Sequence, residues 1–286
     1  MKGIVLAGGT GSRLWPITLT TSKQLLPVYD KPMIYYPIST LMLAGVRDIL
    51  IITTPQDADA FKKLLGDGSE LGLQFSYATQ PHPEGLAQAF IIGEDFLDDD
   101  SCMMVLGDNI FHGVGLGNEL KNSLPDQGAH IFTYEVADPR QYGILTVDEN
   151  GIPLSIVEKP SVSESNLAVT GLYFFDKNVS EVAKGVKPSK RGELEITSVI
   201  DHYLQERTLS VTQLSRGTAW LDTGNPNAMH DAATYIRVIE ERTGLKIACI
   251  EEIAYKNGWM SRESLDKKIE ENSKNSYGAY LAKIRK

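Results

Sequence analysis

Cysteine is scarce in this chain, and long apolar runs are missing. Among 286 residues only Cys102 and Cys249 carry a thiol, and they match neither a metal-ligand nor a redox spacing. They predict two buried thiols in a reducing compartment. No window reaches the roughly 18 uninterrupted apolar residues of a membrane span, and the apolar start is too short for a signal sequence. We therefore expect a cytoplasmic protein that does not bind a membrane.

Basic residues are also fewer than acidic residues. Lys and Arg number 28 against 37 Asp and Glu, which gives a net charge of −9. This balance argues against a nucleic-acid partner and against an anionic membrane bound through a basic face. An acidic protein that binds a polyphosphate must gather its cations locally. The chain is long enough for one large or two small α/β domains.

Two familiar phosphate-binding loops are absent. The P-loop pattern G-x-x-x-x-G-K-[ST] occurs nowhere in the chain. The dinucleotide fingerprint G-x-G-x-x-G/A, started at Gly9, ends on Leu14. The helix that this fingerprint requires is replaced by Trp15-Pro16 and a Thr/Ser-rich run. A nicotinamide-dependent oxidoreductase is therefore disfavoured.

A different glycine cluster is present after the first apolar strand. Arg13 and Lys23 follow it closely. Glycines permit positive φ and close approach, so that successive N–H groups can surround a phosphate, and the two cations would add charge-assisted hydrogen bonds. A plain glycine turn is the alternative, but the cations favour a polyphosphate site. The cluster consists of Gly8, Gly9, Thr10 and Gly11.

Strand-like and helix-like stretches alternate along the chain. This alternation predicts an α/β fold, a doubly wound and mostly parallel sheet flanked by helices, with a helical C-terminal appendage. We expect a nucleotide-binding domain over 1–226 and a helical segment over 227–286. Strands are predicted at 3–7, 48–53, 73–78, 102–106, 130–135, 144–147, 154–158 and 169–175. Helices are predicted at 32–44, 57–65, 86–96, 194–205 and 227–242.

Polar residues at the ends of strands are the next candidates, because ligands of open α/β sheets bind at the carboxyl edge. Asp108 directly follows the apolar run Cys102–Leu106, and Asp222 follows Trp220-Leu221. Each aspartate alone could be an Asx turn. Two of them beside a polyphosphate loop suggest shared ligation of magnesium, which takes one or two carboxylates and otherwise phosphate oxygens and water.

Glu158-Lys159-Pro160 ends another strand. The proline forces an extended or turn conformation that can bring both charged side chains into one cleft. A carboxylate would accept hydrogen bonds from hydroxyls and a lysine would bind a phosphate, which suits a sugar phosphate. A surface ion pair is the alternative. The amides of Gln24 and Gln80 could pair with a base edge.

Several longer runs resemble one known family. They are LAGGTGSRLWPITLTTSKQLLPVYDKPMIYYP at 6–37, QPHPEGLAQAF at 80–90, LGDN at 106–109, EKP at 158–160, RGELEIT at 191–197 and WLDTG at 220–224. These runs are similar to the sugar nucleotidyltransferases, and most of all to the thymidylyltransferases of the dTDP-rhamnose pathway. The likeness spans essentially the whole chain. It implies that dTTP and glucose 1-phosphate react reversibly, with magnesium, to give dTDP-glucose and pyrophosphate.

The resemblance also implies a role for each matching position. Gly8, Gly9, Thr10, Gly11 and Arg13 would hold the triphosphate, and Lys23 would neutralise the leaving pyrophosphate. Gln24, Gln80 and Gly85 would contact the nucleoside, and Asp108 and Asp222 would ligate magnesium. The sugar pocket would be lined by Asn109, Tyr142, Gly143, Glu158 and Val169, with Lys159 on the sugar phosphate. Arg13, Lys23 and Lys159 would act in catalysis.

Such a reaction needs no protein nucleophile or general base, because the sugar phosphate already carries anionic oxygens. We expect the five histidines to be structural or surface residues. The alternatives are UTP or another hexose phosphate as substrate, and a catalytically silent sensor. A silent relative often loses a metal ligand or the phosphate-binding arginine, whereas Asp108, Asp222, Arg13 and Lys23 are all present.

Family resemblance further implies a homotetramer with feedback inhibition by the end product, dTDP-rhamnose, at a separate site. The C-terminal helices are candidates for that role. They follow the last catalytic motif and carry aromatic residues that we expect to be exposed, namely Trp259, Tyr277 and Tyr280.

Overall fold

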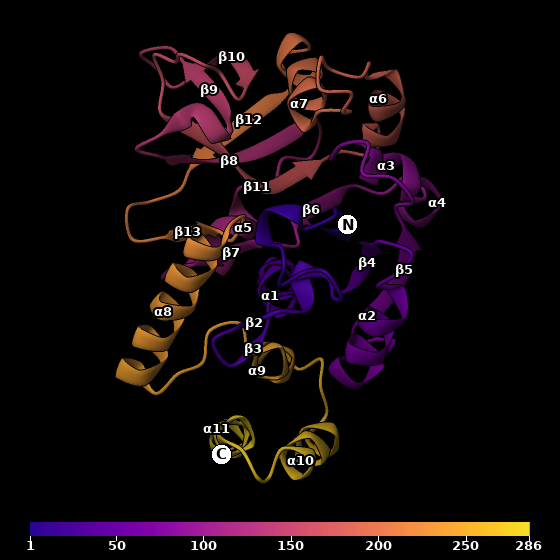
Figure 1. Ribbon diagram of the computed structural model, residues 1–286, viewed down its shortest axis with the longest axis vertical. Helices are drawn as coiled ribbons and strands as arrows, with labels where there is room; N and C mark the ends of the chain where they lie inside the picture. Colours follow the sequence, from indigo (N-terminus) through magenta and orange to yellow (C-terminus); the bar gives the residue numbers. More distant parts are fainter. Residues whose placement is uncertain (286) are drawn as a thin grey trace.

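The computed structural model describes residues 1–285 and shows an α/β sheet with helices on both faces (Figure 1). Its parallel part has the order β6-β1-β4-β5. Val5 on β1 lies opposite Ile51 on β4 and Val105 on β6. Continuous apolar runs form these strands because both faces are covered. The strands are β1 (Lys2–Ala7), β4 (Asp48–Thr53), β5 (Gln74–Thr79) and β6 (Cys102–Leu106).

The second part of the sheet is antiparallel. Strand β11 (Leu167–Phe175) runs antiparallel to β6 and continues the sheet through β9 (Gly143–Val147) to the edge strand β10 (Pro153–Glu158). Strand β8 (Ala129–Glu135) also pairs with β11, and β12 (Leu209–Gln213) lies parallel to β8. The expected α/β sheet is confirmed, and its antiparallel strands form one wall of the site described below.

Alternate residues of the central strands point to opposite faces of the sheet and belong to two separate hydrophobic cores. Val5, Ile51 and Val105 pack with α1 (Tyr35–Leu43) and the C-terminal helices, whereas Ile4 and Met104 pack on the opposite face. That opposite face is covered by α3 (Gln88–Ile92), α4 (Glu94–Leu97), α6 (Val179–Gly185) and α7 (Ile196–Gln205). The period of two along each strand therefore produces the double winding. Two further helices are α2 (Ala58–Leu65) and α5 (Leu116–Asn122).

Two predicted helices have different bounds in the structure. The helix expected at 32–44 begins only at Tyr35, because Lys31 and Pro32 form β3 and pair with β2 (Pro27–Val28) in a small hairpin. The helix expected at 86–96 is split at Gly93 into α3 and α4. Both differences arise from glycine or proline interrupting a helical pattern.

A second small sheet brings distant segments together near the cleft. Strand β7 (Asn109–His112) follows β6 directly and pairs antiparallel with β13 (Ala219–Asp222). Helix α8 (Pro226–Thr243) starts just after β13, with the Asn225 side chain accepting a hydrogen bond from the Ala228 N–H at 3.0 Å. A proline at the first helical position and a glycine beyond the last are typical helix boundaries.

The C-terminal appendage consists of α9 (Ile250–Lys256), α10 (Arg262–Glu271) and α11 (Ser276–Ile284), drawn in yellow at one end of the molecule in Figure 1. Its aromatic residues are packed, so the expectation of exposed aromatics was wrong. Tyr280 is buried, the Tyr277 hydroxyl donates to Glu251 at 2.5 Å, and the Arg47 guanidinium lies 5.5 Å from the Trp259 ring. These aromatic residues belong to or pack against the hydrophobic core that contains Val5, Ile51 and Val105, instead of facing solvent.

Other expectations about burial hold. Cys102 and Cys249 are both buried free thiols. Across residues 1–285, the structure has no helix with the length and apolar character needed to cross a bilayer.

Candidate active site

A cleft of about 480 Å³ opens at the carboxyl end of the parallel strands. Every site residue predicted from the sequence lines it, although Gly8 and Asp222 lie at opposite ends of the expected α/β domain. The lining includes Gly8, Gly9, Thr10, Gly11, Arg13, Lys23, Gln24, Gln80, Gly85, Asp108, Asn109, Tyr142, Gly143, Glu158, Lys159, Val169 and Asp222. The structure therefore brings the candidate residues together; the role of each stays a prediction.

The glycine loop forms the floor at one end of the cleft. Gly9 and Gly11 have φ of 101° and 60°, a region that side chains disfavour. A side chain at Gly8 would overlap the amide oxygen of Gln80, so the loop needs glycine there for space. The Thr18 hydroxyl donates to the Gly11 carbonyl at 2.7 Å and closes the loop. The loop can thus present backbone N–H groups to a polyphosphate.

Asp108 and Lys23 form an ion pair at the centre of the cleft. Burial raises the pKa of the Asp108 carboxyl, but the neighbouring Lys23 charge and hydrogen bonds outweigh burial and lower it overall. The Asn109 amide donates to Asp108 at 2.9 Å and accepts from the Trp220 indole at 2.6 Å. Asp108 is therefore ionised and held in one orientation.

Asp222 lies beside Asp108 because β13 and β7 pair in register, with Asp222 opposite Asn109. Burial and then the negative charge of Asp108 raise the pKa of Asp222 to about 6. The Thr223 hydroxyl donates to the Asp108 carbonyl at 2.8 Å and links the two aspartate segments. Two carboxylates that repel each other are a donor set that a hard divalent cation would stabilise. Within residues 1–285 no cluster of three or more His, Cys, Asp or Glu suited to a metal is found.

The two glutamines predicted to face the nucleoside are buried rather than surface residues. Gln24 and Gln80 are each 5% exposed. The Ser22 hydroxyl donates to the side-chain Oε1 of Gln24 at 2.7 Å, and the side-chain amide of Gln80 donates to Oε1 of Gln88 at 2.7 Å. Gly85 has a φ of 114° and packs against the backbone of Leu194. This end of the cleft is therefore fixed by packing and hydrogen bonds.

The opposite wall is formed by the antiparallel strands β9, β10 and β11. Glu158 and Lys159 both line the cleft, with Lys159 Nζ 3.7 Å from Glu158 Oε1. Lys159 has a φ of 43°, and its N–H donates to the Tyr142 carbonyl at 3.0 Å. The backbone turn before Pro160 thus puts both side chains on the cleft side. Burial raises the pKa of Glu158, partly offset by Lys159.

Arg191 is a cleft residue for which the chemical reasoning gave no role. Its guanidinium contacts Glu195 at 2.8 Å and Glu158 at 3.4 Å, and it lines the cleft beside the wall formed by β9, β10 and β11. It belongs to the RGELEIT run, but an Arg-Gly pair in a loop carries no chemical signal by itself. Trp220 was also missed as a lining residue; its ring lies 5.1 Å from that of Tyr142. None of the histidines described among residues 1–285 is part of this lining.

Comparison with known proteins agrees with this arrangement. The nucleotidyl transferase family model matches residues 2–238. Glucose-1-phosphate thymidylyltransferase of Neisseria meningitidis is 54% identical over 287 residues and 100% of both chains. The Mycobacterium tuberculosis enzyme of the same name is 54% identical over 99% of both chains.

Solved structures show the same fold. UDP-glucose pyrophosphorylase complexed with UDP-glucose superposes with a TM-score of 0.74 at 25% identity, covering 83% of this chain and 98% of its own. A Bacillus anthracis protein crystallised with sucrose, provisionally assigned as a glucose-1-phosphate thymidylyltransferase, gives 0.76 at 39% identity over 83% and 95% of the chains. The resemblance noted in the sequence is confirmed: the chain is an enzyme of the nucleotidyltransferase family.

Proposed function

We propose that the enzyme transfers a thymidylyl group from dTTP to glucose 1-phosphate, giving dTDP-glucose and pyrophosphate. The observation that carries this proposal is the single cleft with two different ends. One end holds a glycine loop with Arg13 and Lys23, suited to a polyphosphate, and the other holds Glu158 and Lys159, suited to a sugar phosphate. Relatives of more than 50% identity over their full length carry the corresponding name.

Magnesium fits the donor set of the cleft, and Asp108 and Asp222 would hold it. When bound, it would neutralise charge on the phosphate oxygens. The support for this assignment is the pair of neighbouring buried carboxylates, whose repulsion a cation would relieve. Lys23 forms an ion pair with Asp108, so the same carboxylate would contact both the lysine and the magnesium ion.

The chain's own residues would act by position and charge. A phosphate oxygen of the sugar phosphate attacks the α-phosphorus, and the pyrophosphate leaves from the opposite side. Lys159 and Arg191 would hold the attacking phosphate, while Arg13 and Lys23 stabilise the charge on the leaving group. The attacking oxygen is already anionic, so no residue needs to remove a proton.

We extend the proposal to the cellular setting implied by the sequence resemblance. The reaction would be the first step of dTDP-rhamnose biosynthesis in the cytoplasm, in a homotetramer inhibited by dTDP-rhamnose. Size-exclusion chromatography with light scattering tests the tetramer, and inhibition by dTDP-rhamnose at saturating dTTP tests a separate site. Truncation after residue 257 with unchanged assembly and inhibition would remove the C-terminal helices from this role.

Pyrophosphate release tests the reaction itself. The purified enzyme is assayed with magnesium, glucose 1-phosphate and, in turn, dTTP, UTP, ATP, GTP and CTP. Strong preference for dTTP is the expected result. Preference for UTP would keep the chemistry and change the nucleoside. No turnover with any of the five nucleotides would point first to a different sugar phosphate and then to a silent nucleotide-sugar sensor.

A further inference from the structure

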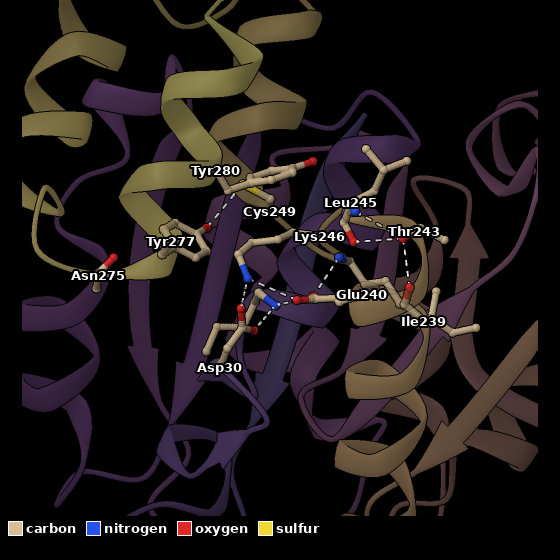
Figure 2. Close-up of polar contacts among 12 residues, drawn as sticks. Asp30, Ile239, Glu240, Thr243, Leu245, Lys246, Cys249, Asn275, Tyr277 and Tyr280 are labelled. Atoms are coloured by element: carbon tan, nitrogen blue, oxygen red, sulfur yellow. Dashed lines mark hydrogen bonds and ion pairs between the residues drawn. The ribbon is translucent and has the colours of Figure 1, made fainter.

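We infer that Lys246, which lies outside the cleft, is a positioning residue for the nucleotide end of the active site. The inference rests on the proposed function for its kinetic readout. Lys246 lies between α8 and α9, and its side chain is 11% exposed. Figure 2 shows it pointing toward Asp30 and Glu240, beside the tyrosines of α11.

Lys246 joins three segments that are distant in sequence. Its ammonium pairs with Asp30 on the hairpin and with Glu240 on α8, the latter at 3.1 Å. It also lies 5.6 Å from the Tyr277 ring and 6.0 Å from the Tyr280 ring, within cation–π range. The hairpin, α8 and the C-terminal helices therefore meet at one positive charge.

A second lysine completes a balanced buried cluster. Lys31 pairs with the same two carboxylates, at 3.0 Å for Glu240, and its side chain is 2% exposed. Glu240 also accepts the Ile247 N–H at 2.9 Å. Two cations thus satisfy two anions. Buried ion pairs of this kind add little net stability compared with apolar packing, and a fixed geometry is the better-supported reason for them.

The hairpin transmits this geometry to the cleft through backbone hydrogen bonds. The Met33 N–H donates to the Leu26 carbonyl at 2.9 Å, and the Ile34 N–H donates to the Gln24 carbonyl at 2.9 Å. Lys23 and Gln24 therefore belong to the same hydrogen-bonded unit as Asp30, which lies at the tip of the hairpin. This unit carries the two residues that face the polyphosphate and the nucleoside.

A second contact connects the same hairpin to the aspartates. The Thr223 hydroxyl donates to the Asp108 carbonyl, and Met33 Sδ lies 3.3 Å from the same hydroxyl oxygen. The sugar wall lies elsewhere: Glu158 ends β10, the edge strand at the far end of the sheet from β4 and β5. A shift of the hairpin should therefore disturb the nucleotide end and spare the sugar end.

Lys246→Met tests the inference, because methionine keeps the apolar stem and removes the charge. KM for dTTP should rise roughly tenfold, with KM for glucose 1-phosphate within about twofold of the wild type. Lys246→Arg should restore the wild-type value, since the charge is kept. Affinity for dTTP measured by calorimetry should fall in parallel, a readout that does not depend on turnover.

A charge-balanced variant guards against simple unfolding. Lys246→Met combined with Glu240→Gln removes one charge of each sign, so Lys31 and Asp30 remain paired, and it should show the same loss for dTTP. Lys267→Met is the matched control: it also breaks an ion pair between the C-terminal segment and the sheet domain, with Glu70, but its side chain is 60% exposed. Its kinetics should be unchanged.

Two results would overturn the inference. One is a dTTP affinity equal to that of the wild type in both Lys246→Met and the double variant Lys246→Met with Glu240→Gln. The other is an equal rise of KM for both substrates, which would indicate general loosening. If the wild-type enzyme itself shows no turnover but binds dTTP, the proposed function fails while calorimetry still decides the role of Lys246.

Discussion

Two lysines face the same cleft from opposite walls, and their surroundings differ. Lys23 is anchored beside the parallel half of the sheet, with a side chain only 9% exposed and paired with Asp108. Lys159 comes from the antiparallel edge, is 44% exposed, and lies 3.7 Å from Glu158. The first is part of the packed interior, whereas the second is a cation at the surface.

This contrast extends to the walls themselves. The wall that carries the glycine loop depends on backbone conformations that favour glycine, as at Gly9 and Gly85, and on buried glutamines. The opposite wall includes Glu158 and Lys159 at the end of the edge strand β10, and both side chains are more exposed than Gln24 and Gln80. If the two walls have the proposed roles, nucleotide recognition is tied to the fold more closely than sugar recognition. The predictions below test this division.

Asp108→Asn should have the largest effect. It removes the charge shared by Lys23 and the proposed metal, so kcat should fall roughly 100-fold or more, about 2.7 kcal/mol. Steady-state pyrophosphate release measures it. Asp59→Asn, on the exposed face of α2, is the matched control and should be neutral. A loss below tenfold would contradict a central role for Asp108.

Arg13→Ala should come next. If the guanidinium contacts charge that develops in the transition state, kcat/KM should fall by about 2 kcal/mol, roughly 30-fold. Arg237→Ala serves as control, because Arg237 is exposed on α8 and pairs with Glu241 at 2.8 Å. Equal behaviour of the two variants would remove Arg13 from the active centre.

Lys159→Ala should affect binding more than rate. The exposed lysine contributes one charge-assisted contact to the sugar phosphate, so KM for glucose 1-phosphate should rise about tenfold while kcat stays within about threefold. Lys177→Ala, another exposed lysine, should be silent. A change confined to KM for dTTP would reverse the assignment of the two walls.

The parallel half of the sheet and the position of the cleft were the features predicted most clearly from the sequence. Apolar runs such as Cys102–Leu106 predict buried strands. Because the carboxyl ends of parallel strands lie at one edge of the sheet, Asp108 and the glycine loop were expected to be neighbours, and both line the cleft. Strand β12 was missed because its residues, LSVTQ, are mixed and only partly buried. The Lys23–Asp108 pair joins residues 85 positions apart, and a local sequence pattern does not predict such a contact.

Packing of the C-terminal segment was harder to predict. An amphipathic helix reveals that one face is apolar but not which surface covers it, so Tyr280 was expected outside and lies inside. The buried charges of Lys31 and Glu240, which pair with Asp30 and Lys246, resemble ordinary surface residues in the sequence. The domain boundary after residue 226 stays a prediction.

The smallest expected effect concerns stability in the antiparallel half. His130 on β8 is 3% exposed, and its Nδ1 lies 2.8 Å from the Ser210 hydroxyl, while Nε2 has no partner among the described residues. Burial lowers the pKa of His130 to about 4, below the value near 6.5 of an unfolded chain. The unfolded state therefore binds the extra proton first, so the free energy of unfolding falls as pH decreases through this window.

Between pH 7 and 5.5 this single histidine should lower the free energy of unfolding by about 1.2 kcal/mol. Urea titrations at the two pH values measure the difference for wild type and for His130→Asn, in which the pH-dependent loss should shrink by that amount. His202→Asn is the matched control, because His202 is exposed on α7 rather than buried in the sheet. If both variants behave alike, protonation in the antiparallel core does not limit acid stability, and the two halves of the sheet respond to pH in the same way.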